Sequence, residues 1–289
     1  MANTIANVYI ETFEQNLRHV AQQETAKLLP WVQLRGEESE NHNWEKLGAS
    51  DAAVKTTRLQ ATPVADTAWA RRVAVSQTWD NGESTEQEDP VQMLVDPNSN
   101  LVMSLGYSMR RAQDDVILTA ATADALEGDG STTAVTAGQI VGDYTTAIDF
   151  DSITAIQEIF MKNDIDPSVP KVAIVGPTQV RKLMQLTENT SSDYVQAQRL
   201  QQYGIAPNWL GFDWICSTRV NYPTAVGDDV DCVFMTKSAI GMNMPKNITA
   251  KVAEDPSISF AWRIYVMAVM GAVRVQDEHL VWAKFADTV

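Results

Sequence analysis

The chain has 289 residues, 45% of them hydrophobic, so it can bury a large core and exceeds the size at which single cores usually divide into subdomains. Its formal net charge of -15 argues against tight binding of nucleic acid, because such binding neutralises phosphates with clustered Lys and Arg. It has no apolar stretch of about eighteen residues and no secretory pattern at its N-terminus, so we expect a cytoplasmic origin and no membrane span.

Residues 1 to about 35 begin the chain with an amphipathic pattern. Apolar side chains recur at helical spacing at Ile5, Val8, Tyr9, Phe13, Leu17 and Val20. The pattern predicts a short helix. Two interpretations stay open: an ordinary first helix packed on its own core, or an arm whose apolar side needs a partner.

Residues 36–90 form a long polar segment with two stretches of alternating character, "HNWEKLG" (42–48) and "WARRVAVSQTW" (69–79). Such alternation predicts strands. The residues between them, 49–68, are too many for a turn inside a compact domain, and loops of that length are usually functional or disordered. We therefore expect a projecting hairpin.

The predicted hairpin is basic in an acidic chain. From 46 to 72 it carries five cations and two acids, a net charge of +3, whereas the flanks at 37–45 and 80–89 are acidic. The cations are Lys46, Lys55, Arg58, Arg71 and Arg72. For an isolated protein, a solvated loop of ordinary charge would explain this pattern.

Residues 96–122 give the strongest local signal in the chain. Asp96 stands at an N-cap position and Pro97 at the first helical position, where its missing N–H costs nothing. An apolar stripe follows at Leu101, Leu105, Met109, Ala112, Val116 and Ala120. The expected ion pairs on the polar side are Arg110–Asp114 and Arg111–Asp115. The pattern predicts a rigid helix of roughly 40 Å, longer than the usual three turns.

A Gly- and Thr-rich stretch at 128–143 marks a boundary, and an α/β section follows from about 146 to 244. Its expected elements are a helix at 151–163 begun by an Asp cap, a strand at 172–175, a helix after Pro177 and a strand at 212–220. The β-branched apolar runs behind it predict strands at 248–255, 263–275 and 279–286.

We predict no catalytic residue, no cofactor and no metal site. His19, His42 and His279 stand apart, with no Cys or second His at metal-ligand spacing, and are expected at the surface or hydrogen-bonded in the core. Cys216 and Cys232 are expected to be reduced core residues.

Two further patterns fall short of binding sites. The stretch "KVAIVGPTQVRKLMQL" (171–186) is similar to a phosphate-binding strand–helix unit, but it lacks both glycine signatures and Pro177 removes an N–H. The acidic segments 127–132 and 227–231 lack the alternating ligand spacing of a calcium loop, so we expect turns there.

Taken together, the order of these segments resembles the major capsid proteins of tailed bacteriophages, whose Hong Kong 97-type fold is shared with the herpesvirus capsid floor. The stretches that carry the resemblance are "HNWEKLG" (42–48), "EDPVQMLVDPNS" (88–99), "RRAQDD" (110–115), "NDIDPSVPKVAIVGP" (163–177) and "GAVRV" (271–275). The similarity covers nearly the whole chain, and it rests on the order and spacing of the stretches rather than on any one of them.

The resemblance implies an α+β fold of the Hong Kong 97-like capsid type. Its parts would be an N-terminal arm (1–35), an extended loop or E-loop (36–90), a peripheral domain (91–145 with the spine helix, and the C-terminal strands 245–289) and an axial domain (146–244). Family members often carry a long N-terminal scaffolding extension that a protease removes. Here the arm starts almost at once, so we expect scaffolding to come from a separate protein or to be dispensable.

The resemblance also implies a structural subunit, not an enzyme, that assembles as hexamers and pentamers into an icosahedral phage head around double-stranded DNA. Expected partners are copies of itself, a portal protein, a scaffolding protein and, as a further candidate, a decoration protein, without a membrane. The chain would lie in the virion, and in the host cytoplasm during assembly. Two alternatives stay open: an encapsulin nanocompartment shell, which shares the fold, and a cytosolic α/β enzyme, which would need convergent titratable groups in a pocket.

In a shell, the basic hairpin would be attracted to the acidic surface of the next copy. We therefore predict inter-subunit contacts at Lys55, Arg58, Arg71 and Arg72. The loop would lie over the neighbour's spine region, with Lys55 and Arg58 near its tip.

Overall fold

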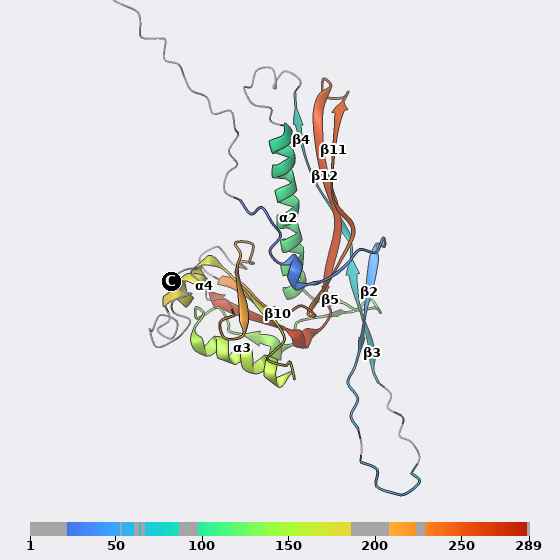
Figure 1. The fold of residues 1–289 in the computed structure, drawn as a ribbon, viewed down its shortest axis with the longest axis vertical. Helices are drawn as coiled ribbons and strands as arrows, with labels where there is room; N and C mark the ends of the chain where they lie inside the picture. Colours follow the sequence, from blue (N-terminus) through green and yellow to red (C-terminus); the bar gives the residue numbers. More distant parts are fainter. Residues whose placement is uncertain are drawn as a thin grey trace, which may run out of the picture.

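The computed structural model describes residues 22–52, 54–60, 64, 67–86, 98–185, 208–223 and 229–287. Figure 1 shows three parts: an upright helix beside long strands, an α/β part at one end of that helix, and a hairpin that projects from their junction. The predicted cap at Asp96 and Pro97 and the amphipathic pattern at 5–20 lie outside the described residues.

The first part joins one long helix to a four-stranded sheet. Its elements are β1 (Gln33–Arg35), β4 (Gln77–Thr85), α2 (Asn98–Thr122), β11 (Ile240–Asp255) and β12 (Ala261–Arg274). The strand order is β1-β11-β12-β4, with β1 parallel to β11 and the other neighbours antiparallel. Helix α2 lies along this sheet, in contact with β12, β4 and β11 (Figure 1).

Helix α2 confirms the predicted long helix and the apolar stripe that was read from its spacing. Leu105 and Met109 pack against Ile264, Val266 and Ala268 of β12. In its second half the helix presents another apolar side to the main core, at Ile117, Leu118 and Ala121. Because it is packed on two sides, α2 is held along its length rather than standing free.

The second part is a five-stranded sheet in the order β7-β13-β10-β8-β9. Its strands are β7 (Ile140–Val141), β8 (Lys171–Val175), β9 (Phe212–Cys216), β10 (Asp229–Thr236) and β13 (Leu280–Ala286). The sequence grouped residues 280–286 with the C-terminal strands, but β13 pairs antiparallel with β10, for example Cys232 opposite Ala283. Apolar patterning reports that a strand is buried but not which sheet it joins, and this pairing is remote in sequence.

Two helices flank this sheet, α3 (Phe150–Lys162) and α4 (Pro177–Gln185). Asp149 begins α3 as the predicted Asp cap: its carboxylate accepts from the Ser152 N–H at 2.8 Å, and the Ser152 hydroxyl lies 3.1 Å from the Asp149 N–H. This reciprocal capping satisfies two N–H groups of the first turn. The main core lies between these helices, the sheet and the end of α2.

The projecting hairpin consists of β2 (Asn41–Leu47) and β3 (Trp69–Val75), paired antiparallel as predicted. The returning stretch is not one strand, however, because the chain leaves the hairpin at Ser76 and continues as β4 beside β12. A small pair of strands, β5 (Ala125–Leu126) and β6 (Thr132–Thr133), lies against the hairpin base. Among the described residues, no helix is both long and apolar enough to cross a membrane.

Candidate assembly surfaces

The base of the β2–β3 hairpin is fixed to the body by a cluster of buried charges. Arg72 of β3 is 5% exposed, and its guanidinium lies 2.8 Å from Asp277 and 3.2 Å from Glu127. Arg274, at the end of β12, is fully buried; its Nε donates to Asp277 at 2.5 Å, and its two other nitrogens donate to backbone carbonyls. The two buried guanidinium groups are stabilised by the partly buried carboxylates of Asp277 and Glu127.

Two glycines let the hairpin base approach the long strands closely. A Cβ on Gly241 would lie 2.3 Å from the Trp44 ring, and one on Gly271 would lie 2.1 Å from the Val75 carbonyl oxygen. Trp44 then fills a small apolar cluster with Ala74, Ala125, Val273 and Val275. Gly271 begins the "GAVRV" stretch, which gives that motif two physical roles. Gly271 allows close contact with β3, and Arg274 forms an ion pair with Asp277.

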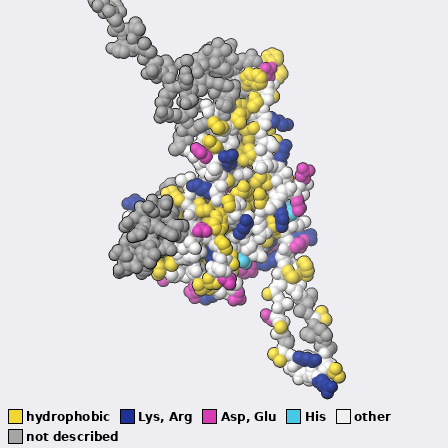
Figure 2. Space-filling model, viewed as in Figure 1, with side chains coloured by type: hydrophobic (Ala, Val, Ile, Leu, Met, Phe, Trp, Pro, Cys, Tyr) yellow, Lys and Arg dark blue, Asp and Glu magenta, His cyan; other side chains and the backbone are white. Residues whose placement is uncertain are grey.

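The rest of the hairpin, residues 48–68, is here called the finger; the structure describes 48–52, 54–60, 64 and 67–68 of it. Pairing of Asn41 with Val75 through Leu47 with Trp69 places the midpoint of the hairpin at Arg58, and a turn is found at 58–59. All residues from 54 to 60 are exposed, and Figure 2 shows basic side chains at the far end of the projection. The finger extends away from the body of its own subunit.

The four predicted contact residues fall into two groups. Arg71 pairs with Glu45 at 2.7 Å on the hairpin surface, and Arg72 is buried in the cluster at the base. By contrast, Lys55 and Arg58 are exposed and form no ion pair with the residues that the structure describes. Lys46, the remaining cation of the hairpin, pairs with Glu278 at 2.9 Å. Of the hairpin's cations, only Lys55 and Arg58 are therefore without an acidic partner in the described chain, and both lie in residues 54–60, here called the tip.

The N-terminal segment 22–28 is held on α2 by a buried acid, Asp114. This fully buried carboxylate accepts hydrogen bonds from the backbone N–H groups of Lys27 and Leu28, at 3.0 and 3.1 Å, and from the Gln23 side chain at 2.5 Å. Carboxylates that accept several N–H groups are held firmly in place. Asp114 therefore anchors the segment to the spine.

The ion pairs predicted along α2 have other partners in the structure. Arg110 donates to the Glu24 carbonyl and Arg111 to the Gln22 side chain, both at 2.7 Å. Asp115 pairs with Arg219, which follows β9. The polar side of the "RRAQDD" stretch thus binds the chain's own N-terminal segment and α/β part. These partners lie 86 to 104 residues away and cannot be read from helical spacing.

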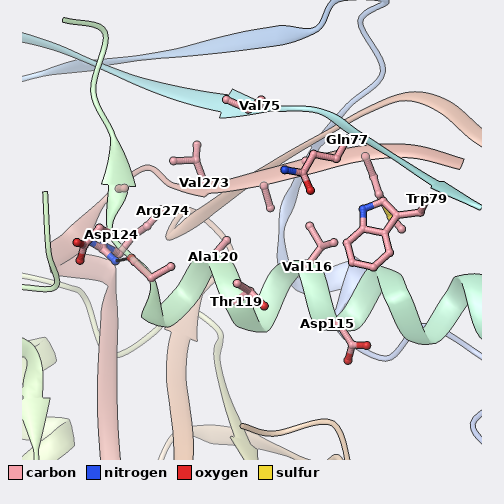
Figure 3. Close-up of a pocket in the computed structure, with 15 residues that line it drawn as sticks. Val75, Gln77, Trp79, Asp115, Val116, Thr119, Ala120, Asp124, Val273 and Arg274 are labelled. Atoms are coloured by element: carbon pink, nitrogen blue, oxygen red, sulfur yellow. Dashed lines mark hydrogen bonds between the residues drawn. The ribbon is translucent and has the colours of Figure 1, made fainter. Parts of the chain in front are cut away.

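A groove of about 390 Å³ lies between α2, the β3–β4 junction and β12, beside the hairpin base. Its apolar lining comes from Val75, Trp79, Val116, Ala120, Met270 and Val273. In Figure 3 Val116 and Ala120 project from α2 toward the strands, and Asp124 and Arg274 are drawn at the same end of the groove. Asp124 is exposed and forms no ion pair within the described part of the chain. We refer to this feature as the spine groove.

The candidate groups for chemistry are hydrogen-bonded or buried. His42 lies 3.0 Å from Glu37, and the His279 Nδ1 lies 2.8 Å from the Thr236 hydroxyl; His19 lies outside the described residues. Cys216 and Cys232 are both free, and burial raises the pKa of the Cys232 thiol to about 12. In the described ranges no group of three or more His, Cys, Asp or Glu could hold a metal ion.

A model of the phage capsid protein family matches residues 5–287 of the chain. The chain belongs to the phage capsid protein family. Among curated protein sequences, none matches this capsid protein.

Solved phage structures share the fold of this capsid protein. A chain of Mycobacterium phage Che8 has 16% identity and a TM-score of 0.74, covering 96% of this chain and 97% of its own. The capsid of Cyanophage P-SCSP1u has 13% identity and a TM-score of 0.75, covering 96% and 93%. The capsid of Helicobacter pylori bacteriophage KHP30 has 9% identity and a TM-score of 0.74, covering 99% and 98%.

These findings decide between the alternatives that the sequence left open. The capsid protein has the Hong Kong 97-type fold and is a structural major capsid protein of the virion, as predicted. The family match favours a phage capsid over an encapsulin shell, and a structural family implies a structural role rather than that of a cytosolic enzyme.

Sequence reasoning missed Asp277 and Glu127 as partners of the hairpin, although an arginine inside the apolar run "GAVRV" signals a buried charge that needs a partner.

Proposed function

We propose that the capsid protein assembles as hexamers and pentamers into an icosahedral phage head that encloses double-stranded DNA, and that the finger is its main contact with the next copy. The observation that carries this proposal is a projection that is fixed at its base by ion pairs of the buried Arg72, and whose tip cations, Lys55 and Arg58, form no ion pair within the described chain. Such an element is suited to binding another molecule. In a capsid that molecule would be another copy of the same chain.

The parts of the chain would keep the roles that the resemblance implies. Residues 36–90 would be the E-loop, α2 the spine of a peripheral domain, and 146–244 an axial domain whose tip meets its copies at the capsomer centre. A net charge of -15 suits a container, since a wall rich in Lys and Arg would hold the packaged DNA and oppose its release. A portal protein and a scaffolding protein would join during assembly in the host cytoplasm, and a decoration protein is a further candidate.

Lys55 and Arg58 would make the charged contacts of the finger with the neighbouring subunit's spine region. Single exposed ion pairs contribute only about 0 to 1 kcal/mol. Every subunit repeats the contact around a ring, so small individual terms have a large joint effect on assembly.

Negative-stain electron microscopy of the purified protein tests the proposal directly. We expect hexamers, pentamers or closed shells at modest concentration. A stable monomer by light scattering, even with scaffolding protein supplied, would contradict the proposal.

The double variant Lys55→Glu with Arg58→Glu tests the charged contact. Wild type should assemble less readily as salt rises, because screening weakens exposed charge pairs, and the double variant should fail at low salt where wild type succeeds. The matched control reverses two other exposed cations, Lys237 in the turn after β10 and Lys251 on β11. If the finger variant gives normal shells with an unchanged salt response while wild type assembles, the finger is not an electrostatic contact.

A further inference from the structure

We propose that the finger tip of one copy inserts into the spine groove of the next copy, with Leu59 against the apolar lining and Arg58 paired with Asp124. The inference rests on the proposed function, since it requires that copies assemble through the finger. It goes further by naming the receiving surface and the residues on each side.

The tip presents apolar side chains that its own subunit does not cover. Leu59 is 88% exposed and Val54 is 87% exposed, and both belong to the described segment 54–60 at the turn of the hairpin. Leu59 also adopts a left-handed backbone conformation, with φ of 59°, which is unusual for a large aliphatic residue. A side chain that is held outward at a turn in this way is suited to insertion into a partner.

The spine groove has the matching chemistry on the same chain. Its volume of about 390 Å³ lies in the range of ligand-sized pockets, roughly 300 to 1,000 Å³, so it can take an aliphatic side chain and part of the backbone beside it. Val116, Ala120 and Val273 form an apolar lining, and Asp124 stands at one end as an exposed acid without an ion pair in the described chain (Figure 3). The apolar Leu59 beside Arg58 on one copy thus complements the apolar groove beside Asp124 on the next.

The reach of the finger fits a contact between neighbouring copies. Arg58 at the turn is about 17 residues beyond Asn41, and a chain of that length can reach at most roughly 55 Å. The groove includes Val75 and Gln77 at the hairpin base, so a tip in the groove joins the far end of one hairpin to the near end of the next. Such a head-to-tail contact is heterologous, the type of contact that builds a ring when its rotation closes.

A cysteine pair across the proposed contact provides the test. Subunits with Leu59→Cys are mixed with subunits that carry Thr119→Cys, an exposed position that lines the groove, and oxidised under assembly conditions. We expect disulfide-linked dimers on a non-reducing gel only when both variants are present. In the matched control, Met184→Cys replaces Thr119→Cys. Met184 is 38% exposed and lies on α4, beside the five-stranded sheet and away from the groove.

Charge reversal gives an independent readout in the same system. Arg58→Glu and Asp124→Lys should each raise the concentration needed for assembly by about tenfold or more, and their combination in one chain should restore assembly, since the ion pair is then reversed rather than lost. Leu59→Ser should have a similar effect without changing the melting temperature of the free subunit, because Leu59 is exposed there. Val64→Ser, at a finger residue that is 93% exposed, is the control and should assemble normally.

The outcomes separate this inference from the proposed function. Shells that form without the cross-link from residue 59 to residue 119, or that link Leu59→Cys to Met184→Cys or to Cys216 instead, would overturn the groove contact while leaving shell assembly intact. Failure of the reversed pair to restore assembly would overturn the Arg58–Asp124 pairing. If wild type forms no capsomers under any condition, the proposed function fails and the inference fails with it.

Discussion

The two ends of the β2–β3 hairpin differ in how they are held. At the base, Arg72 is buried against Asp277 and Glu127, and two glycines bring the strands into close contact with β11 and β12. At the tip, Lys55, Arg58 and Leu59 are exposed to solvent. The hairpin, residues 41–75, therefore contains both a rigid attachment and an exposed binding element. Substitutions at the base should change the stability of the subunit, and substitutions at the tip should change only its association.

The largest expected loss of stability follows from Asp277→Ala. This change removes the shared partner of Arg72 and Arg274, so that the buried Arg274 guanidinium has no carboxylate partner and Arg72 keeps only Glu127. Removing one partner of a buried ion pair typically costs about 3 to 5 kcal/mol. Chemical denaturation of the free subunit measures the difference. Glu278→Ala is the matched control in the same turn: its carboxylate is 51% exposed and pairs with Lys46, so about 0 to 1 kcal/mol is expected. Equal effects of the two substitutions would contradict the account of the base.

A second substitution tests the close approach at the base. Gly271→Ala places a Cβ against the backbone of Val75 and Ser76, and backbone yields less readily than a side chain, so we expect a cost of about 1 to 3 kcal/mol or more. Gly106→Ala on α2 is the control with the opposite sign. A Cβ there meets nothing within 4 Å, and the gain in helix propensity should stabilise the protein by about 0.5 to 1 kcal/mol.

Asp114→Asn tests the anchor of the N-terminal segment. Asn keeps only one acceptor oxygen, whereas Asp114 accepts from Leu28 N–H at Oδ1 and from Lys27 N–H at Oδ2, so one of these two N–H groups loses its acceptor. Loss of a buried hydrogen bond should cost about 1 to 3 kcal/mol. Trypsin cleavage after Lys27 should become faster than in wild type at temperatures well below unfolding. Asp115→Asn, which weakens a surface pair with Arg219, should leave the rate of that cleavage unchanged.

The smallest expected effect concerns pH and His279, which follows the cluster at the base. Burial lowers the pKa of this imidazole, opposed by Glu278 and assisted by Lys46. The folded state therefore binds fewer protons than the unfolded state in the interval below the ordinary pKa of about 6.5, and stability is lost as the pH falls through that interval. Denaturation at pH 7.5 and pH 5.5 should show a smaller loss in His279→Gln than in wild type. An identical loss would exclude His279 as a contributor.

Local signals in the sequence predicted the helices and the hairpin well. The 3.6-residue spacing from Leu101 to Ala120 corresponds to α2. The helix predicted at 151–163 with an Asp cap corresponds to α3, which Asp149 caps. Alternation in "HNWEKLG" corresponds to β2. In each case the signal and the structure involve the same few residues, so short-range patterns were sufficient.

The remote contacts could not be predicted in the same way. Arg72 was expected to contact a neighbouring subunit. Its partner within the subunit, Asp277, lies 205 residues further along the chain. Asp114 was assigned to a pair with Arg110, because helical spacing cannot show that the amides of Lys27 and Leu28 lie closer. Spacing detects charges that are neighbours on one helix, whereas burial of a charge depends on tertiary packing.

Hydrogen exchange of the free subunit and of the assembled particle tests the contrast between base and tip most directly. The account predicts that amides of β3 are protected in both states, whereas amides of residues 54–60 exchange rapidly in the free subunit and become protected on assembly. Rapid exchange at 54–60 in assembled particles would contradict the central claim that the tip is a binding element.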